Sequence, residues 1–126
     1  MASPQYMAGH PSLPFCEAVR VGDVLYLSGQ IGTSPGNPSG VVPGGIEVET
    51  HRALENVREV LARAGLSVER VFKCTVMLAD MNEWADMNRA YLAFFGEHRP
   101  ARSSFGTTGL ALGARVEIEC AAWAAG

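Results

Sequence analysis

The sequence predicts an α+β protein in which one mixed sheet carries two helices on one face. Three observations predict it: two segments with the period of amphipathic helices, short β-rich runs around and between them, and the resulting order β-β-α-β-α-β-β. The chain has 126 residues, of which 48% are hydrophobic and 18% charged, so we expect a single domain over residues 1–126.

The first predicted element is a β-hairpin. Two extended apolar runs, 18–21 and 24–29, flank the two-residue turn Gly22–Asp23. Residues 1–14 precede it as an N-terminal extension, which lacks the basic start and apolar middle of a secretory signal. After the hairpin, ten of the fourteen residues in 32–45 are Gly, Pro or Ser, which predicts a long loop that forms a rim or cover.

A helix from Glu47 to a stop at Gly65 is the clearest element. Apolar and small residues recur at helical spacing on one side of it, namely Thr50, Leu54, Val57, Leu61 and Ala64. Charged residues occupy the other side, namely Arg52, Glu55, Arg58, Glu59 and Arg63. The β-rich segment 68–79 follows. Its alternation predicts a strand with one apolar face, made of Phe72, Cys74, Val76 and Leu78.

The last third of the chain predicts one more helix and two strands. The helix ends at Gly96, and its large side chains at helical spacing indicate core rather than a cofactor site: Trp84, Met87, Tyr91 and Phe94. Two strands follow at 102–108 and 115–123, and we predict that they form a hairpin around residues 109–113.

The last strand alternates charged and apolar side chains. Arg115, Glu117 and Glu119 point to one face if Val116, Ile118 and Cys120 point to the other. Because the two helices cover only one face of the sheet, the charged set must face solvent, a polar cavity or a subunit interface.

Composition and charge exclude several classes of protein. The formal net charge of −3 gives no general basic field for a polyanion, so nucleic acid is an unlikely partner. No apolar run is long enough to span a membrane, and we expect a cytoplasmic protein. Three scattered histidines and three cysteines without a CxxC pair indicate neither a metal site nor a disulfide framework.

The cysteines divide into two groups. Cys74 and Cys120 fall in apolar strand patterns and are interpreted as buried core side chains. Cys16 stays open between a structural and a reactive role, and a carboxylate such as that of Glu17, if close to the sulfur, would disfavour the reactive thiolate.

The strongest candidate for chemistry is Arg102, which follows a proline turn ahead of a strand. A guanidinium that is held in this way can bind a planar anion such as a carboxylate. Glu117 or Glu119, on the predicted partner strand, can position or deprotonate a water beside it. The alternative is a cross-strand ion pair between arginine and glutamate, which is the commoner outcome of this spacing.

Other catalytic motifs give weaker signals. Ser28 ends a predicted strand before Gly29, and its hydroxyl can hold a water or a substrate oxygen, but Ser-Gly is also a common turn pair. The chain contains no GxSxG, GxGxxG or P-loop motif, so serine hydrolysis, Rossmann-type cofactor binding and nucleotide hydrolysis lack support.

Six short segments of the chain match one known pattern: 18–23, Leu27–Ser28–Gly29–Gln30–Ile31, 53–57, Asn88–Arg89–Ala90–Tyr91 with Phe94–Phe95 after it, Pro100–Ala101–Arg102–Ser103, and Val116–Glu117–Ile118–Glu119. Together they resemble the Rid family, the YjgF family of reactive-intermediate deaminases, whose members are also called endoribonuclease L-PSP or translation inhibitor proteins. The resemblance covers residues 15–123.

This resemblance implies a chorismate-mutase-like fold that assembles as a homotrimer with clefts between subunits. It implies hydrolysis of small 2-enamino or 2-imino acids to 2-keto acids and ammonia, without metal or cofactor. Arg102 would bind the substrate carboxylate and Glu117 would orient the attacking water. The substrate-binding positions carried over from the family are Phe15, Ser28, Asn88, Tyr91 and Ser104.

The chain departs from the family pattern at a few positions. Many members have Pro-Tyr-Ser where this chain has Pro14–Phe15–Cys16, so a tyrosine hydroxyl is absent from the expected cleft. This departure affects the choice of substrate more than the reaction class. Two further functions stay open: a binding or regulatory protein for small carboxylates without turnover, and a ribonuclease or translation inhibitor.

Overall fold

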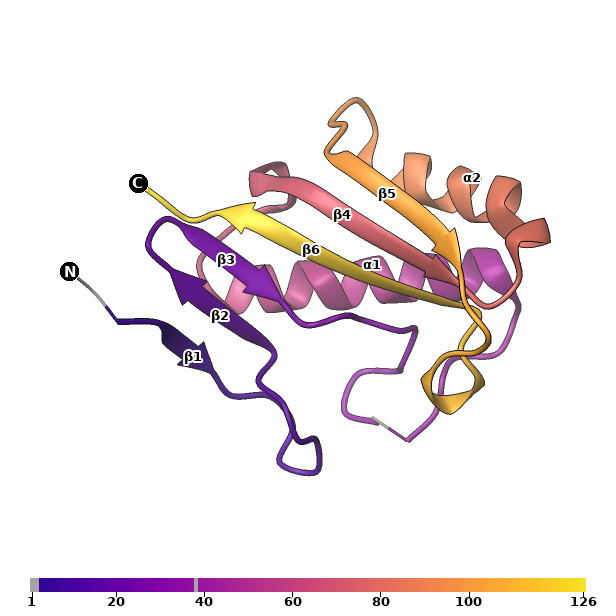
Figure 1. Ribbon diagram of the computed structural model, residues 1–126, viewed down its shortest axis with the longest axis horizontal. Helices are drawn as coiled ribbons and strands as arrows, with labels where there is room; N and C mark the ends of the chain where they lie inside the picture. The colour runs from indigo at the N-terminus through magenta and orange to yellow at the C-terminus, as the bar shows by residue number, and fades with distance from the viewer. Residues whose placement is uncertain (1–2, 38) are drawn as a thin grey trace.

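A computed structural model describes residues 3–37 and 39–126 and has the predicted α+β architecture. Six strands form one mixed sheet in the order β1-β2-β3-β6-β4-β5, and two helices cover one of its faces (Figure 1). In chain order the elements are β1 (Gln5–Met7), β2 (Ala18–Val21), β3 (Val24–Leu27), α1 (Ile46–Arg63), β4 (Val71–Leu78), α2 (Trp84–Phe95), β5 (Ala101–Gly106) and β6 (Val116–Trp123).

The hairpin and both helices are confirmed close to their predicted bounds. Strands β2 and β3 pair antiparallel across the turn, where Gly22 adopts a positive φ of 58°. Helix α1 buries the predicted apolar side, and both Leu54 and Val57 are fully buried. Among residues 3–37 and 39–126, no helix is long and apolar enough to cross a membrane.

The sheet contains one strand more than the sequence predicts. Residues 1–14 are expected to be an extension, but β1 lies within that segment and pairs antiparallel with β2, with Tyr6 opposite Val19. Met1 and Ala2 lie outside the described residues, as does Pro38 in the long 32–45 loop. Three residues without strong apolar alternation gave no sequence signal for β1.

The predicted hairpin between the last two strands is wrong. Strand β5 pairs parallel with β4, and β6 pairs antiparallel with β4 on its other edge. A strand that follows a helical crossover commonly returns parallel to the strand before the helix, and this connection places β5 at the sheet edge. Strand β6 then lies between β3 and β4 and gains hydrogen bonds on both sides.

Two local predictions of the core are also wrong. A register shift between Val71 and Lys73 turns Phe72 out of the apolar face, and the Phe72 side chain is 44% exposed. In α2 the buried side chains are Met87, Tyr91 and Phe95, whereas Trp84 is exposed and Phe94 is half-buried. The face of α2 that packs into the core is therefore rotated slightly, about the helix axis, from the face that the sequence pattern indicates.

The two faces of β6 differ as predicted. Val116, Ile118 and Cys120 are buried against the helices, and Glu117 and Glu119 lie on the opposite face. Because side chains opposite each other in register share a face, the register partners Met77 and Thr75 lie on this open face too. Strand β5 follows the same rule, so its residues divide between the helix-covered face and the open face.

Candidate active site

Arg102 lies on the helix-covered face, beneath α2. Its register partner on β4 is the buried Cys74, and its Nη1 donates a hydrogen bond of 2.7 Å to Oδ1 of Asn88. The guanidinium lies 4.8 Å from the ring centre of Tyr91 and 5.7 Å from that of Trp84. Two aromatic faces and one amide thus hold a half-buried cation in one orientation.

Two buried hydroxyl groups lie in the same region. Neither the Tyr91 hydroxyl nor the Ser104 hydroxyl has a hydrogen-bond partner within the described residues. Burial, and then the neighbouring Cys74 thiol, raise the pKa of Tyr91 well above its usual range, so the phenol stays protonated and remains a donor. A buried hydroxyl without a partner is costly, so both groups are poised to bond to a bound molecule or water.

A cleft of about 260 Å³ opens beside Arg102. Its walls come from α2 and from the turn into β5, and they are formed by Asn88, Tyr91, Leu92, Arg99, Pro100 and Arg102. Leu92 and Pro100 supply apolar surface, and Arg102 supplies a fixed positive charge. A cleft with this lining and volume suits a small organic anion.

Glu117 lies on the other face of the sheet from Arg102. The expected cross-strand pairing of these residues is therefore wrong, because β4 separates β5 from β6 and the two side chains point in opposite directions. The alternative of an Arg102–Glu117 ion pair within one chain fails for the same reason. One chain presents the arginine and the glutamate as two separate half-sites.

The Glu117 carboxylate packs directly over Gly29. A Cβ atom added to Gly29 would lie 2.1 Å from Oε2 of Glu117, so the backbone of the Ser28–Gly29 segment forms the floor beneath this carboxylate. Burial, followed by repulsion from Glu119, raises the pKa of Glu117 above its ordinary value. Glu117 is thus a base of increased proton affinity, which suits the handling of a water.

Ser28 and Phe15 lie near this second half-site along the chain, and each has a contact of its own. The Ser28 hydroxyl donates a hydrogen bond of 2.6 Å to the backbone carbonyl of Cys16, so it fixes the loop that follows Phe15. Its oxygen can still accept a bond from a ligand. Phe15 is half exposed and lines a larger cleft next to α1.

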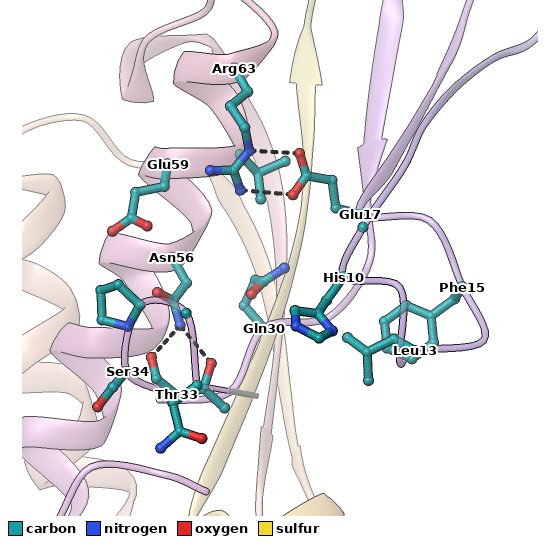
Figure 2. A pocket seen from close by; sticks show the side chains of 15 residues that line it. His10, Leu13, Phe15, Glu17, Gln30, Thr33, Ser34, Asn56, Glu59 and Arg63 are labelled. Carbon is teal, nitrogen blue, oxygen red and sulfur yellow. Dashed lines mark hydrogen bonds and ion pairs between the residues drawn. The ribbon is translucent and has the colours of Figure 1, made fainter. Parts of the chain in front are cut away.

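That larger cleft has a volume of about 460 Å³ and lies between α1, the 9–17 segment and the 30–37 segment. Figure 2 shows the side chains that line it. Its charged groups are all paired: Arg63 makes two bonds of 2.8 and 2.7 Å to Glu17, and Glu59 pairs with Arg52 outside the cleft. Asn56 donates to the carbonyls of Ile31 and Thr33 and thereby attaches the start of the loop to α1. These polar groups are already used in holding segments together, which leaves the Arg102 cleft as the better binding site.

Gly29→Ala tests the close approach of Glu117 to the backbone. We expect kcat/KM for the reaction of the site to fall about a hundredfold, because the new methyl group displaces the carboxylate by about 1 Å. Gly40→Ala is the matched control, since its added Cβ would meet open space. Circular dichroism melting should show both variants folded, and full activity of Gly29→Ala would contradict a role for the Glu117 position.

Trp84 is the residue of this region that sequence reasoning placed wrongly, in the core. It is exposed at the start of α2, and its ring faces the Arg102 guanidinium. Asn88 follows Trp84 by four residues and Tyr91 follows Asn88 by three, so the sequence did contain the signal of one shared helix face.

Within the described residues, no three His, Cys, Asp or Glu side chains gather closely enough to hold a metal ion.

Comparison with known proteins gives consistent matches over nearly the whole chain. The family model described as Endoribonuclease L-PSP matches residues 7–124. The chain is 41% identical to a mouse protein named 2-iminobutanoate/2-iminopropanoate deaminase over 109 residues, which are 86% of this chain and 80% of the mouse protein.

Two solved structures are closely similar in fold. The crystal structure of yeast YEO7 has a TM-score of 0.89 and 31% identity, and the match covers 98% of this chain and all of that one. The crystal structure of Escherichia coli TdcF with bound serine has a TM-score of 0.83 and 32% identity, with 95% of this chain and 94% of that chain covered.

Proposed function

Because this chain belongs to the Endoribonuclease L-PSP family, which is the Rid or YjgF family, we propose that it is an imine deaminase. It hydrolyses small reactive 2-enamino and 2-imino acids to 2-keto acids and ammonia. The mouse relative is named for the four-carbon and three-carbon imino acids, and the TdcF structure contains bound serine, which like those imino acids carries a carboxylate.

The fixed position of Arg102 is the observation that supports this function best. The bond to Asn88 uses one of the five N–H groups of the guanidinium, so a forked pair of donors remains for a substrate carboxylate. Tyr91 and Trp84 hold the guanidinium plane in place before the substrate arrives. An anion site that is organised in advance loses little conformational entropy on binding.

The chemistry follows from the two half-sites. The enamine takes a proton at carbon and becomes the imine, whose carboxylate binds to Arg102. Glu117 accepts a hydrogen bond from a water and directs the oxygen of that water at the imine carbon. The C–O bond forms as the C=N π bond opens, Glu117 takes one proton of the water, and the nitrogen takes a proton from solvent to give the carbinolamine. The proton held by Glu117 then passes to the carbinolamine nitrogen, the C–N bond breaks to release ammonia, and the hydroxyl proton leaves to solvent as the C=O bond of the keto acid forms. Positioning supplies most of the acceleration, because imines already hydrolyse in water.

A second copy of the chain completes the site in this proposal. Arg102 with Asn88, Tyr91 and Ser104 forms one half-site near the edge strand β5, whereas Glu117 with Ser28 and Gly29 forms the other half-site on the open face. The open face also exposes Tyr26, Phe105 and Trp123, which is typical of a surface that becomes buried on assembly. A homotrimer with three equivalent clefts satisfies both observations.

The direct test is release of keto acid from a freshly generated imine. A pyridoxal-phosphate-dependent dehydratase acting on serine or threonine supplies the substrate, and a keto-acid dehydrogenase reports the product. We expect the protein to accelerate release well above the spontaneous rate. Tight carboxylate binding by calorimetry without acceleration would instead indicate a binding or regulatory protein, and RNA cleavage that survives extensive purification would indicate a ribonuclease.

The raised pKa of Glu117 predicts the pH dependence of the reaction. Glu117 must be ionised to act as a base toward the attacking water, so kcat/KM falls as the pH drops through its raised pKa. Glu119→Gln removes the neighbouring negative charge and should move this acid limb to lower pH. Glu69→Gln, at an exposed position before β4, is the control that leaves the limb in place. If the fall of kcat/KM at low pH occurs at the same pH in Glu119→Gln, a group other than Glu117 causes that fall.

The same shift predicts a cost in stability. A carboxyl whose pKa is raised by folding contributes stability below its unfolded pKa, and that contribution is lost as the pH rises through its folded pKa. Ionised Glu117 therefore destabilises the folded chain near neutral pH. This cost is typical of a group that is retained for function.

We propose that the protein acts in the cytoplasm. The three cysteines are odd in number and contain no CxxC pair, a usage typical of proteins from a reducing compartment.

A further inference from the structure

Two of the three cysteines face each other in the core beneath Arg102. Cys74 on β4 and Cys120 on β6 are direct partners in the antiparallel register, and their sulfur atoms lie 3.3 Å apart. Cys74 is fully buried and Cys120 is 5% exposed. Antiparallel partners have Cα atoms about 4.5 to 5.5 Å apart, which is within the range that a disulfide spans.

The pair continues a row of side chains that crosses three neighbouring strands. Arg102 on β5 is the register partner of Cys74, and Cys74 is the register partner of Cys120. All three side chains lie on the helix-covered face, and the Tyr91 ring packs over Arg102 at the start of this row. The thiols are therefore the layer directly behind the candidate anion site, although the deamination mechanism does not use them.

We propose that Cys74 and Cys120 form a redox-active dithiol, a modification site that reacts with a small hydroperoxide and closes into a disulfide between β4 and β6. This property does not depend on the deaminase activity. The sulfur atoms need to approach by about 1.2 Å to reach the bond length of a disulfide. Strands β4 and β6 are already paired on both sides of the cysteines, so closing the bond requires no change of register.

The reaction balances with one peroxide for each pair. The Cys74 thiolate attacks one peroxide oxygen, the O–O bond breaks, and Cys74 becomes a sulfenic acid as hydroxide leaves and takes a proton. The Cys120 sulfur then attacks the sulfenic sulfur, the S–S bond forms, the S–O bond breaks, and water leaves with the proton of Cys120. Two thiols lose two electrons in total, and the peroxide is reduced to two waters.

The surroundings of the two thiols assign them different roles. Cys74 is the register partner of Arg102, which lines the cleft, whereas Cys120 lies on β6, one strand further from that cleft. An oxidant that enters beside Arg102 therefore meets Cys74 first. Cys74 is therefore the attacking thiol, and Cys120 is the thiol that resolves the sulfenic acid.

Access for an oxidant comes from the cleft beside Arg102. Tyr91 and Arg102 line this cleft, and both are neighbours of Cys74. Hydrogen peroxide is small and uncharged, so a brief local opening of the packing beneath this cleft is enough to admit it. A large oxidant is excluded by the same packing, which makes the pair selective for small hydroperoxides.

Hydrogen peroxide followed by mass spectrometry tests the proposal on the native, reduced protein. We expect the chain to lose about 2 Da, with one linked peptide pair that contains Cys74 and Cys120. The free thiols should fall from three to one, and dithiothreitol should restore them. This experiment on the unsubstituted chain needs no variant to fold.

Matched variants separate the three thiols. Cys16→Ser should still form the linked pair, whereas Cys74→Ser and Cys120→Ser should not. In Cys120→Ser the sulfenic acid should persist at Cys74, where dimedone traps it. The proposal is overturned if peroxide modifies Cys16 while Cys74 and Cys120 stay reduced, if Cys74 passes to the sulfinic acid in the unsubstituted chain, or if the linked pair forms only in denaturant.

Discussion

Arg102→Ala should lower kcat/KM for imine hydrolysis about a thousandfold and leave the spontaneous rate. Truncating one partner of a partly buried, hydrogen-bonded charge pair costs about 4 kcal/mol, and each 1.36 kcal/mol is a factor of about ten in rate. The Asn88 amide loses its cationic partner in this variant, and the cleft loses the charge that binds the carboxylate. The coupled dehydratase assay measures the change after subtraction of the uncatalysed rate.

Arg102→Lys separates charge from geometry. Lysine keeps the positive charge but presents no planar fork and cannot stack between Tyr91 and Trp84 as a guanidinium does. We expect an intermediate loss, of about thirtyfold, carried mainly by KM because carboxylate binding weakens. Arg89→Ala is the matched control, since Arg89 lies on α2 next to Asn88 but pairs with Asp86 and Glu47 on the exposed surface. Activity equal to that of the unsubstituted chain in Arg102→Ala would exclude the proposed role.

Local pattern was sufficient for the elements whose neighbours in space are also neighbours in sequence. The hairpin of β2 and β3 has a turn that contains Gly22, and α1 has a continuous apolar stripe through Leu54 and Val57, so their signals are contained in short windows. The alternation in β6 also predicted correctly which face carries Glu117.

The pairing between strands that are distant in the chain could not be predicted from such short sequence windows. The residues of β5 alone do not indicate whether this strand pairs with β4 or with β6. The pairing with β4 follows from the helical crossover through α2, which returns the chain parallel to β4. The shift at Phe72 likewise arises from pairing of β4 with β6, since a strand alone has no register. The same pairing separates Arg102 from Glu117, so the divided site was beyond the reach of local pattern.

The candidate site residues divide in a comparable way. Arg102 was found from its proline turn, but its partner Asn88 and the packing of Trp84 depend on how α2 crosses β5. The sequence around Gly29 did not indicate that this residue matters for the site. Gly29 matters because the absence of a side chain leaves space for Glu117, which lies on a strand almost ninety residues later in the chain. Sequence thus indicated which residue types carry the chemistry, and the fold determined which of them meet.

Mixed assemblies of two inactive variants should recover activity, because each cleft takes Arg102 and Glu117 from different chains. Arg102→Ala and Glu117→Gln should each be inactive alone. When equal amounts are unfolded together and refolded, a cleft is intact if its arginine comes from one variant and its glutamate from the other. Random assembly of a cyclic oligomer gives about one intact cleft in four, and we expect about a quarter of the activity of the unsubstituted protein.

The opposite arrangement gives a sharply different result, and this makes the mixing experiment decisive. If both residues of a cleft came from a single chain, every cleft would lack one of them and no mixture would recover activity. Mixing Arg102→Ala with the double variant Arg102→Ala/Glu117→Gln is the control, since no chain in that mixture supplies an arginine. Native mass spectrometry should show trimers that contain both variants. Zero recovery in verified mixed trimers would place the arginine and the glutamate in one chain, against the opposite faces of the sheet on which they lie.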